Sequence, residues 1–325
     1  MSILVTGATG FVGKCLVEEL LKQKLSVSAV VRINEAFLPN GAIKVCIPDL
    51  TVKSDWQPIL KNINVVVHVA AWAHIMNDVA NPLAEFRKVN RDATLHLARQ
   101  AAKANVKRFV FLSSIKVNGE MTGGDIHPNP LPKGEGIKDC FTEDDMFVPD
   151  DPYGLSKYEA EQGLLAIAKE TCMEVVIIRS PLIYGPNVQA NFASMIKWIN
   201  KIVPLPFGAI HNQRSLVALD NLVSFIIHCI DHPKAANEIF LISDGEDVST
   251  TELLQKVAKA LGKKSLLLPV PVSWMIFAAK LIGKEAVANR LFGSLQVDSS
   301  KARDLLGWKP VITMDEQLKK MADAD

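Results

Sequence analysis

Short apolar runs alternate with segments of helical periodicity through the first half of the chain. The runs 65–67 and 175–178 are apolar at every position, which is typical of strands covered by helices on both faces of a parallel sheet. Segments such as 83–104 and 153–170 repeat apolar residues every three or four positions and indicate helices. This alternation predicts an α/β fold with a doubly wound parallel sheet.

The alternation ends near residue 179, where proline and glycine interrupt the chain. We therefore expect residues 1–178 to form the sheet domain. Residues 179–325 should form mainly a smaller α/β lobe that binds the substrate, with residues 215–242 returning to the sheet domain. Ligands of open α/β sheets bind beyond the carboxyl ends of the strands, so the site is expected between the lobes.

The most apolar late stretch is Leu266–Ile282, which prolines and Lys280 interrupt. It is too short and too broken for a transmembrane segment, so we expect a buried helix, near Val272–Leu281, with loose surface association as the alternative. The chain enters an apolar run directly after Met1, which leaves no room for a signal peptide and favours a cytoplasmic protein.

The charge balance favours a small-molecule partner. Lysine and arginine total 36 against 35 acidic residues, so the net charge of +1 argues against nucleic acid as a partner. The five cysteines form no CxxC pair and the histidines no HExxH motif, so we expect reduced thiols and no metal site.

A glycine-rich loop follows the first strand and opens a helix. Its glycines suit a tight turn (Gly7), a close approach to a pyrophosphate (Gly10) and close helix packing (Gly13). With Thr9, Phe11 and Val12, the loop is expected to bind a dinucleotide at the positive end of the helix. The first domain is therefore predicted to be a Rossmann domain.

The second strand ends at Val31-Arg32, where an NAD-binding strand usually carries an acidic residue for the ribose hydroxyls. Arg32 could instead face a ribose 2′-phosphate, so NADP(H) is the preferred cofactor and NAD(H) remains possible. Asp49 and Leu50, after the next apolar run, are expected to contact adenine.

A candidate catalytic group combines Tyr153 and Lys157, one helical turn apart, with Ser114 at the end of an earlier strand. A phenol must become a better acid–base at neutral pH, and we expect the positive charge of Lys157 to lower its pKa. Ser114 would hold the reacting oxygen in line.

Together these motifs resemble the extended short-chain dehydrogenase/reductase family, in particular its nucleotide-sugar epimerase/dehydratase branch. The resemblance covers essentially the whole chain. It rests on the glycine loop, His68-Val69-Ala70-Ala71, Asn90, Ser113-Ser114, Tyr153/Lys157, the segment from Arg179 to Asn187, and the late signature within 299–308.

The resemblance implies roles for individual residues. Ser114 would be the catalytic hydroxyl, while further residues would line the cofactor cleft: Ala70, Ala71, Asn90, Ser113 and Pro181. Arg214 would grip the diphosphate of a nucleotide sugar, UDP-linked by expectation, with Arg290 and Asn191 as further substrate contacts. Paired helices at 83–104 and 153–170 would make a homodimer through their surplus apolar residues, which are Leu95, Leu97, Leu164, Leu165 and Ile167.

One departure narrows the chemistry. Ile115-Lys116 replaces the Asp-Glu pair that serves dehydration in the family's 4,6-dehydratases. What remains is redox chemistry at one carbon. Arg32 favours reduction of a 4-keto, 6-deoxy-hexosamine type nucleotide sugar for surface-polysaccharide synthesis. The alternatives are a UDP-glucose or UDP-GlcNAc type 4-epimerase and a reductase of an apolar ketone, which would have no use for Arg214. The segment 120–152 either closes over the sugar or is a solvated acidic loop.

Overall fold

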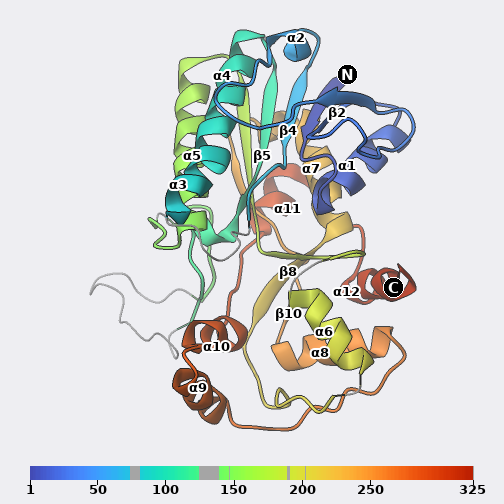
Figure 1. Ribbon diagram of the computed structural model, residues 1–325, viewed down its shortest axis with the longest axis vertical. Helices are drawn as coiled ribbons and strands as arrows, with labels where there is room; N and C mark the ends of the chain where they lie inside the picture. The colour runs from blue at the N-terminus through green and yellow to red at the C-terminus, as the bar shows by residue number, and fades with distance from the viewer. Residues whose placement is uncertain (74–80, 124–138, 146, 189–190, 202, 325) are drawn as a thin grey trace.

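The computed structural model describes residues 1–73, 81–123, 139–145, 147–188, 191–201 and 203–324. A larger body built around a sheet stands above a smaller lobe in Figure 1. The two bodies meet where the strands of the large sheet end, which is where the sequence predicted the site.

The large sheet has seven parallel strands in the order β3-β2-β1-β4-β5-β6-β9. The chain winds outward in one direction from β1 to β3 and in the other from β4 to β9, so the predicted doubly wound sheet is confirmed. The strands are β1 (Ser2–Thr6), β2 (Ser26–Val31), β3 (Ile43–Cys46), β4 (Val65–His68), β5 (Arg108–Ser114), β6 (Glu174–Ser180) and β9 (Ile239–Leu241).

Alternate side chains of each strand enter two separate cores. Ile3 and Val5 pack against α1 (Phe11–Lys22), α7 (Leu219–Asp231) and α11 (Ser300–Leu306) on one face. Leu4 packs on the other face, which is covered by α2 (Gln57–Leu60), α4 (Thr94–Lys103) and α5 (Pro152–Glu170). Burial on both faces explains why the strands lack polar alternation.

The helix expected at 83–104 is not uniform. It begins as α3 (Pro82–Phe86), widens into a π-helical stretch η1 (Arg87–Ala93), and continues as α4. Within this stretch Arg87 and Arg91 both bind Glu159 of α5, and Asn90 is buried against the segment after β4. Apolar periodicity does not report such a change of pitch, because both helix types bury one face.

The lower lobe contains a three-stranded sheet, ordered β10-β8-β7, and most of the remaining helices. Side chains from α6, α8 and α12 form its core with β7 and β8. The bounds are β7 (Leu182–Tyr184), β8 (Arg214–Ala218), β10 (Asp247–Val248), α6 (Asn191–Asn200), α8 (Thr250–Ala260) and α12 (Met314–Ala324). Two short 3-10 turns belong to the upper body: η2 (Ile115–Val117) contacts α5, and η3 (Pro233–Ala235) contacts α11.

The expectation of a buried helix at Val272–Leu281 is wrong. The helix forms with these bounds as α9, but none of its residues is buried. It packs with α10 (Glu285–Phe292) at one side of the lower lobe, away from the large sheet (Figure 1). An apolar sequence predicts burial only where other elements are available to cover it. In the described part of the chain, no helix is both long and apolar enough to cross a bilayer.

Candidate active site

The glycine loop between β1 and α1 is packed too tightly for side chains. Gly7 has φ +72°, and a Cβ there would lie 2.8 Å from the backbone nitrogen of Ala70. A Cβ on Gly13 would lie 2.1 Å from the carbonyl oxygen of Gly7. The loop is closed by a 2.9 Å hydrogen bond from the Gly10 N–H to the Gly7 carbonyl. Glycine is therefore required for this geometry, and Gly7 lies directly against the strand that leads to Ala70.

The first turn of α1 is open to an anion. Its N-cap is Gly10, so no side chain caps the helix, and its first turn holds no acidic residue. Thr9 is exposed, Phe11 half-buried and Val12 buried. Uncapped N–H groups at the positive end of a helix suit a phosphate, so this loop fits the pyrophosphate of a dinucleotide.

The residues expected near the adenosine lie beyond the neighbouring strands. Arg32 follows β2 directly and is exposed. Asp49 and Leu50 follow β3; the Asp49 carbonyl accepts a 2.7 Å hydrogen bond from the Ser54 hydroxyl, and Leu50 packs partly against the core. The structure thus places Arg32 at the strand end that normally meets the ribose.

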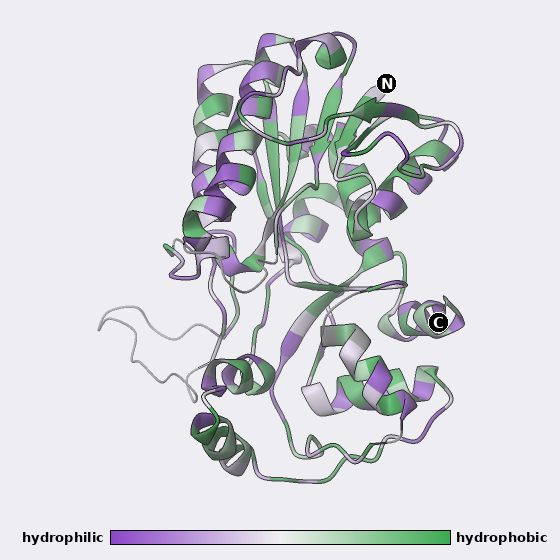
Figure 2. Cartoon of the chain, viewed as in Figure 1, coloured by the Kyte–Doolittle hydropathy of each residue, from purple (hydrophilic) through white to green (hydrophobic). Residues whose placement is uncertain are grey.

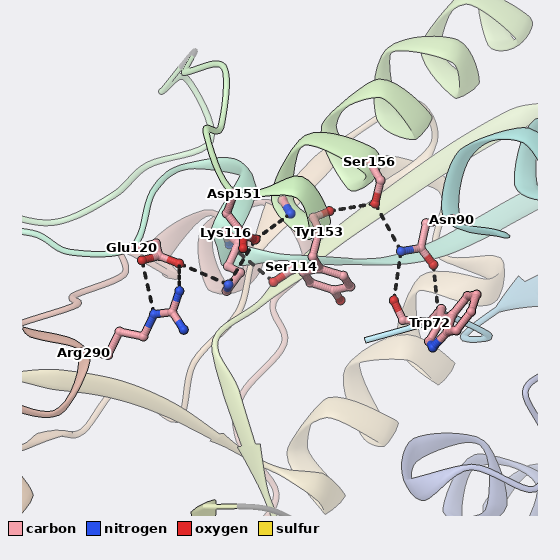
Figure 3. Close-up of polar contacts among 10 residues, drawn as sticks. Trp72, Asn90, Ser114, Lys116, Glu120, Asp151, Tyr153, Ser156 and Arg290 are labelled. Carbon is pink, nitrogen blue, oxygen red and sulfur yellow. Dashed lines mark hydrogen bonds and ion pairs between the residues drawn. The ribbon is translucent and has the colours of Figure 1, made fainter. Parts of the chain in front are cut away.

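Ser114 and Tyr153 come together at the end of β5, next to the first turn of α5 (Figure 3). Asp151 caps α5 by accepting a 2.8 Å hydrogen bond from the Gly154 N–H. Phe86 packs edge-on against the phenol, with ring centroids 5.7 Å apart. The phenol therefore lies between the end of β5, the first turn of α5 and the ring of Phe86.

The expectation of a lowered Tyr153 pKa is wrong for this state of the protein. Burial raises the pKa of Tyr153 to about 12, and the nearby Asp151 adds to this, while a hydrogen bond with Ser114 acts in the opposite direction. The phenol is thus protonated at neutral pH and can donate a proton. Acting as a base requires positive charge to be added beside it.

Lys157 is almost completely buried one turn further along α5. Its Nζ donates a 2.9 Å hydrogen bond to the Leu112 carbonyl and lies 4.4 Å from the centroid of the Phe111 ring. Burial lowers the pKa of Lys157 to about 7, and the carboxylate of Glu161 partly opposes this. A lysine with a pKa near neutrality is typical of functional sites.

Asn90 lies between Trp72 and Ser156 near the phenol (Figure 3). Its Oδ1 accepts from the Trp72 N–H at 2.8 Å, and its Nδ2 donates to the Trp72 carbonyl at 3.0 Å and the Ser156 hydroxyl at 3.1 Å. Both amide hydrogens are used, so Asn90 ties the segment of Ala70 and Ala71 to α5.

Lys116 binds two carboxylates beside the phenol, and the sequence did not reveal these contacts. Its Nζ donates to Glu120 at 3.1 Å and to Asp151 at 3.0 Å, and it lies 5.9 Å from the centroid of the Tyr153 ring. Glu120 in turn forms an ion pair with Arg290 of α10 at 3.1 Å (Figure 3). This chain of charges joins the helix that carries Tyr153 to the lower lobe.

A buried ion pair behind the site was also missed. Glu161 and Arg179 are joined at 2.7 Å and are both nearly inaccessible. Arg179 also donates to Asn118 at 3.1 Å, and the Ser113 hydroxyl is bonded to Glu161. The spacing of Lys157 and Glu161, one turn apart on α5, indicates that Glu161 lies near the site, but its partner Arg179 meets it only in the fold. The Ser113 hydroxyl is therefore occupied by the buried ion pair. Pro181, the other residue expected near the cofactor cleft, is buried just beyond β6.

Arg214 and Arg290 lie together, and each already has partners within the protein: Arg214 binds backbone carbonyls and Arg290 pairs with Glu120. The Nη1 of Arg214 donates to the carbonyls of Arg290 at 2.7 Å and Gly293 at 3.0 Å, and burial lowers the pKa of its guanidinium. Asn191 begins α6, but its side chain lies outside the described residues. Within 120–152, residues 124–138 and 146 also lie outside them, so the structure does not decide between a lid and a solvated loop.

The fold is a doubly wound sheet, and the glycine loop after β1 opens an uncapped helix. Ser114 lies at the end of β5, and Tyr153 and Lys157 lie in the first turns of α5. Together these features define a dinucleotide-binding oxidoreductase of the short-chain type. The sequence profile of the NAD dependent epimerase/dehydratase family matches residues 3–243. The chain belongs to this family and is an enzyme of it.

Similar proteins agree with this assignment. A UDP-glucose 4-epimerase of Vibrio cholerae is 48% identical over 99% of this chain and 95% of that protein. The UDP-glucuronic acid 4-epimerase of Bacillus cereus, solved with NAD, is 22% identical with a TM-score of 0.77, over 100% of this chain and 98% of that one. The UDP-glucose 4-epimerase of Thermotoga maritima, solved with UDP-glucose, is 24% identical with a TM-score of 0.73 over the same shares.

Proposed function

We propose that the protein is an NAD-dependent 4-epimerase of a UDP-linked hexose. The observation that carries the proposal is the identity of 48% with a UDP-glucose 4-epimerase along 99% of the chain. The site supports it, since Ser114 is bonded to Tyr153, Lys157 follows one turn along α5, and no carboxylate occupies positions 115 and 116. We therefore place the 4-epimerase first and the 4-ketoreductase, which the sequence alone favoured, second.

In this reaction Tyr153 takes the proton of the sugar 4-hydroxyl and returns it after the ketosugar has turned over. Ser114 holds the reacting oxygen, and Lys157 supplies positive charge on the same helix. Bound NAD supplies a hydride acceptor that also gives the hydride back. Because Tyr153 is protonated at rest, the positive charge of oxidised NAD, when bound, would be needed before the phenol can act as a base.

The diphosphate of the substrate is assigned to the lower lobe. Arg214 stands where β8 begins and is fixed by the end of α10. A planar guanidinium suits adjacent phosphates, whereas an apolar ketone would offer it no partner. Arg214 therefore supports a nucleotide sugar over an apolar substrate.

The test is a cofactor balance. The protein is incubated with UDP-glucose, UDP-GlcNAc and a UDP-4-keto-6-deoxy sugar, with and without NADPH, while products and the absorbance of reduced cofactor are followed. We expect interconversion of 4-epimers without net consumption of cofactor. Stoichiometric consumption of NADPH on the keto sugar, with no epimerisation, would overturn the epimerase proposal.

Arg32 favours a second candidate, an NADPH-dependent 4-ketoreductase. It is exposed at the end of β2, where no acidic residue stands to repel a 2′-phosphate. A charge-assisted contact there is worth roughly 1.5–3 kcal/mol, or about ten- to hundredfold in affinity.

This second candidate is tested by titrating NADPH and NADH into Arg32→Ala, with Arg99→Ala on α4 as an exposed control. The reductase reading expects the wild type to prefer NADPH and Arg32→Ala to lose NADPH affinity alone. A wild-type preference for NADH would remove this candidate.

A further inference from the structure

Exposed apolar side chains gather at the end of the lower lobe. Among the described residues, seven of the seventeen exposed large hydrophobic side chains fall between 266 and 287. Trp274 is 72% exposed, Phe277 65% and Leu281 72%. Figure 2 shows α9 as a largely hydrophobic helix at the extremity of the molecule. Contiguous apolar surface of this kind marks an interaction site.

The exposure follows from the pattern of α9, which is apolar on two faces. Val272, Met275, Ile276 and Ala279 pack towards Phe292 and its neighbours in a small core. Trp274, Phe277 and Leu281 are spaced three and four residues apart and so share another face, which is exposed. The internal packing of the lobe therefore accounts for only half of the apolar residues in α9.

Basic residues accompany this surface. Lys280 and Lys284 lie at the end of α9, and Glu285 pairs with Lys280 at 4.0 Å. Both lysines are exposed, whereas Lys263 and Lys264 follow α8, where Lys263 donates to the carbonyl of Asn200. Lys280 lies beside the exposed face of α9, and Lys284 follows the helix directly.

We propose that the exposed face of α9 docks on an anionic lipid bilayer. A helix with aromatic and aliphatic side chains on one face and lysines beside them is suited to the boundary between headgroups and acyl chains. The lysines would face anionic headgroups while Trp274 and Phe277 enter the boundary.

The charges argue against a second copy of this chain as the occupant. A two-fold interface brings the same patch of both copies together. Here that would bring Lys280 and Lys284 of both copies together, with Glu285, which already pairs with Lys280, as the one carboxylate of this segment to offset them. Like charges at an interface are unfavourable, whereas an anionic surface is complementary.

The test uses the full chain and vesicles. Sedimentation is compared on phosphatidylcholine vesicles and on vesicles with equal parts phosphatidylcholine and phosphatidylglycerol, at low and high salt. We expect binding to the anionic vesicles that weakens with salt. Lys280→Glu/Lys284→Glu should lower the partition coefficient on the order of fivefold for each lysine removed.

The apolar contribution is tested with Trp274→Gln/Phe277→Gln. The matched control is Phe37→Gln, which removes an equally exposed aromatic side chain from the upper body. We expect at least a tenfold loss of vesicle binding for the α9 variant, none for the control, and unchanged turnover of a soluble substrate in both. Absence of wild-type binding to anionic vesicles, or equal loss in control and variant, would overturn the proposal. So would a light-scattering mass that falls in the α9 variant, because it would assign the face to a second copy.

Discussion

At the scale of single residues, the site places a half-buried tyrosine one helical turn from a buried lysine. Tyr153 has a raised pKa and Lys157 a lowered one, and burial is the main cause of both shifts. The phenol is therefore protonated at neutral pH, whereas the pKa of about 7 leaves both the charged and the neutral form of Lys157 populated. Any positive charge that enters the cleft changes the protonation of Tyr153 more than it would change an exposed tyrosine.

We predict that Tyr153→Phe lowers kcat by a factor on the order of 10²–10⁴, the usual contribution of a positioned acid–base group. The fold should be intact, because the aromatic ring and its contact with Phe86 remain. Turnover and thermal unfolding are measured beside Tyr158→Phe, a half-buried tyrosine of the same helix. Near-normal turnover in Tyr153→Phe would exclude the phenol from the chemistry.

Local spacing was sufficient to find these residues but not their environment. Gly7, Gly10 and Gly13 were predictable because a strand, a turn and a helix succeed each other within a dozen residues. The direction of the Tyr153 pKa shift was not, since burial depends on segments distant in sequence. Lys116 was noted only as a departure from a motif, and its partners Glu120 and Asp151 become visible only when the chain is folded.

At the scale of elements, the N-terminus of α5 is held by charge. Asp151 caps the helix and is itself bound by Lys116, which also binds Glu120. Removing Lys116 would leave two carboxylates close together at the turn that carries Tyr153.

We predict that Lys116→Met lowers kcat about tenfold with a smaller change in KM, because displacement of a catalytic group is costly even over short distances. The free energy of unfolding should fall by about 1 kcal/mol. Lys116→Arg should restore much of kcat, and Lys169→Met in the last turn of α5 is the control. Equal kcat in Lys116→Met and wild type would contradict a positioning role.

Helix bounds and helix environments differ in how well sequence predicts them. Val272–Leu281 was predicted to the residue as a helix, yet its burial was wrong, because periodicity does not show whether other elements cover it. The helix at 83–104 was found, but its π-helical centre was not. Pitch is set here by contacts with α5 and with the segment after β4.

At the scale of the whole molecule, the structure alters the basis of the dimer prediction. Leu97, Leu164 and Ile167, counted as surplus apolar residues, are buried in the core of the monomer. Leu95 and Leu165 remain half-buried on α4 and α5.

We still predict a homodimer through these two helices. Light scattering should give twice the mass of one chain at micromolar concentration, and Trp274→Gln/Phe277→Gln should keep that mass because α9 is remote from α4 and α5. A monomer would contradict the prediction.

The π-helical stretch has a consequence for how this chain can evolve. The i→i+5 spacing of Arg87–Ala93 holds one residue more than the ordinary α-helical turns it replaces. Loss of one residue there would let the segment return to ordinary pitch with little change in the facing of α4, so Leu97 and Ala98 would stay in the core. The contacts that depend on the wider turn, among them the hydrogen bonds between Asn90 and Trp72, would be lost. A single deletion in this stretch should therefore leave the core intact and damage the site.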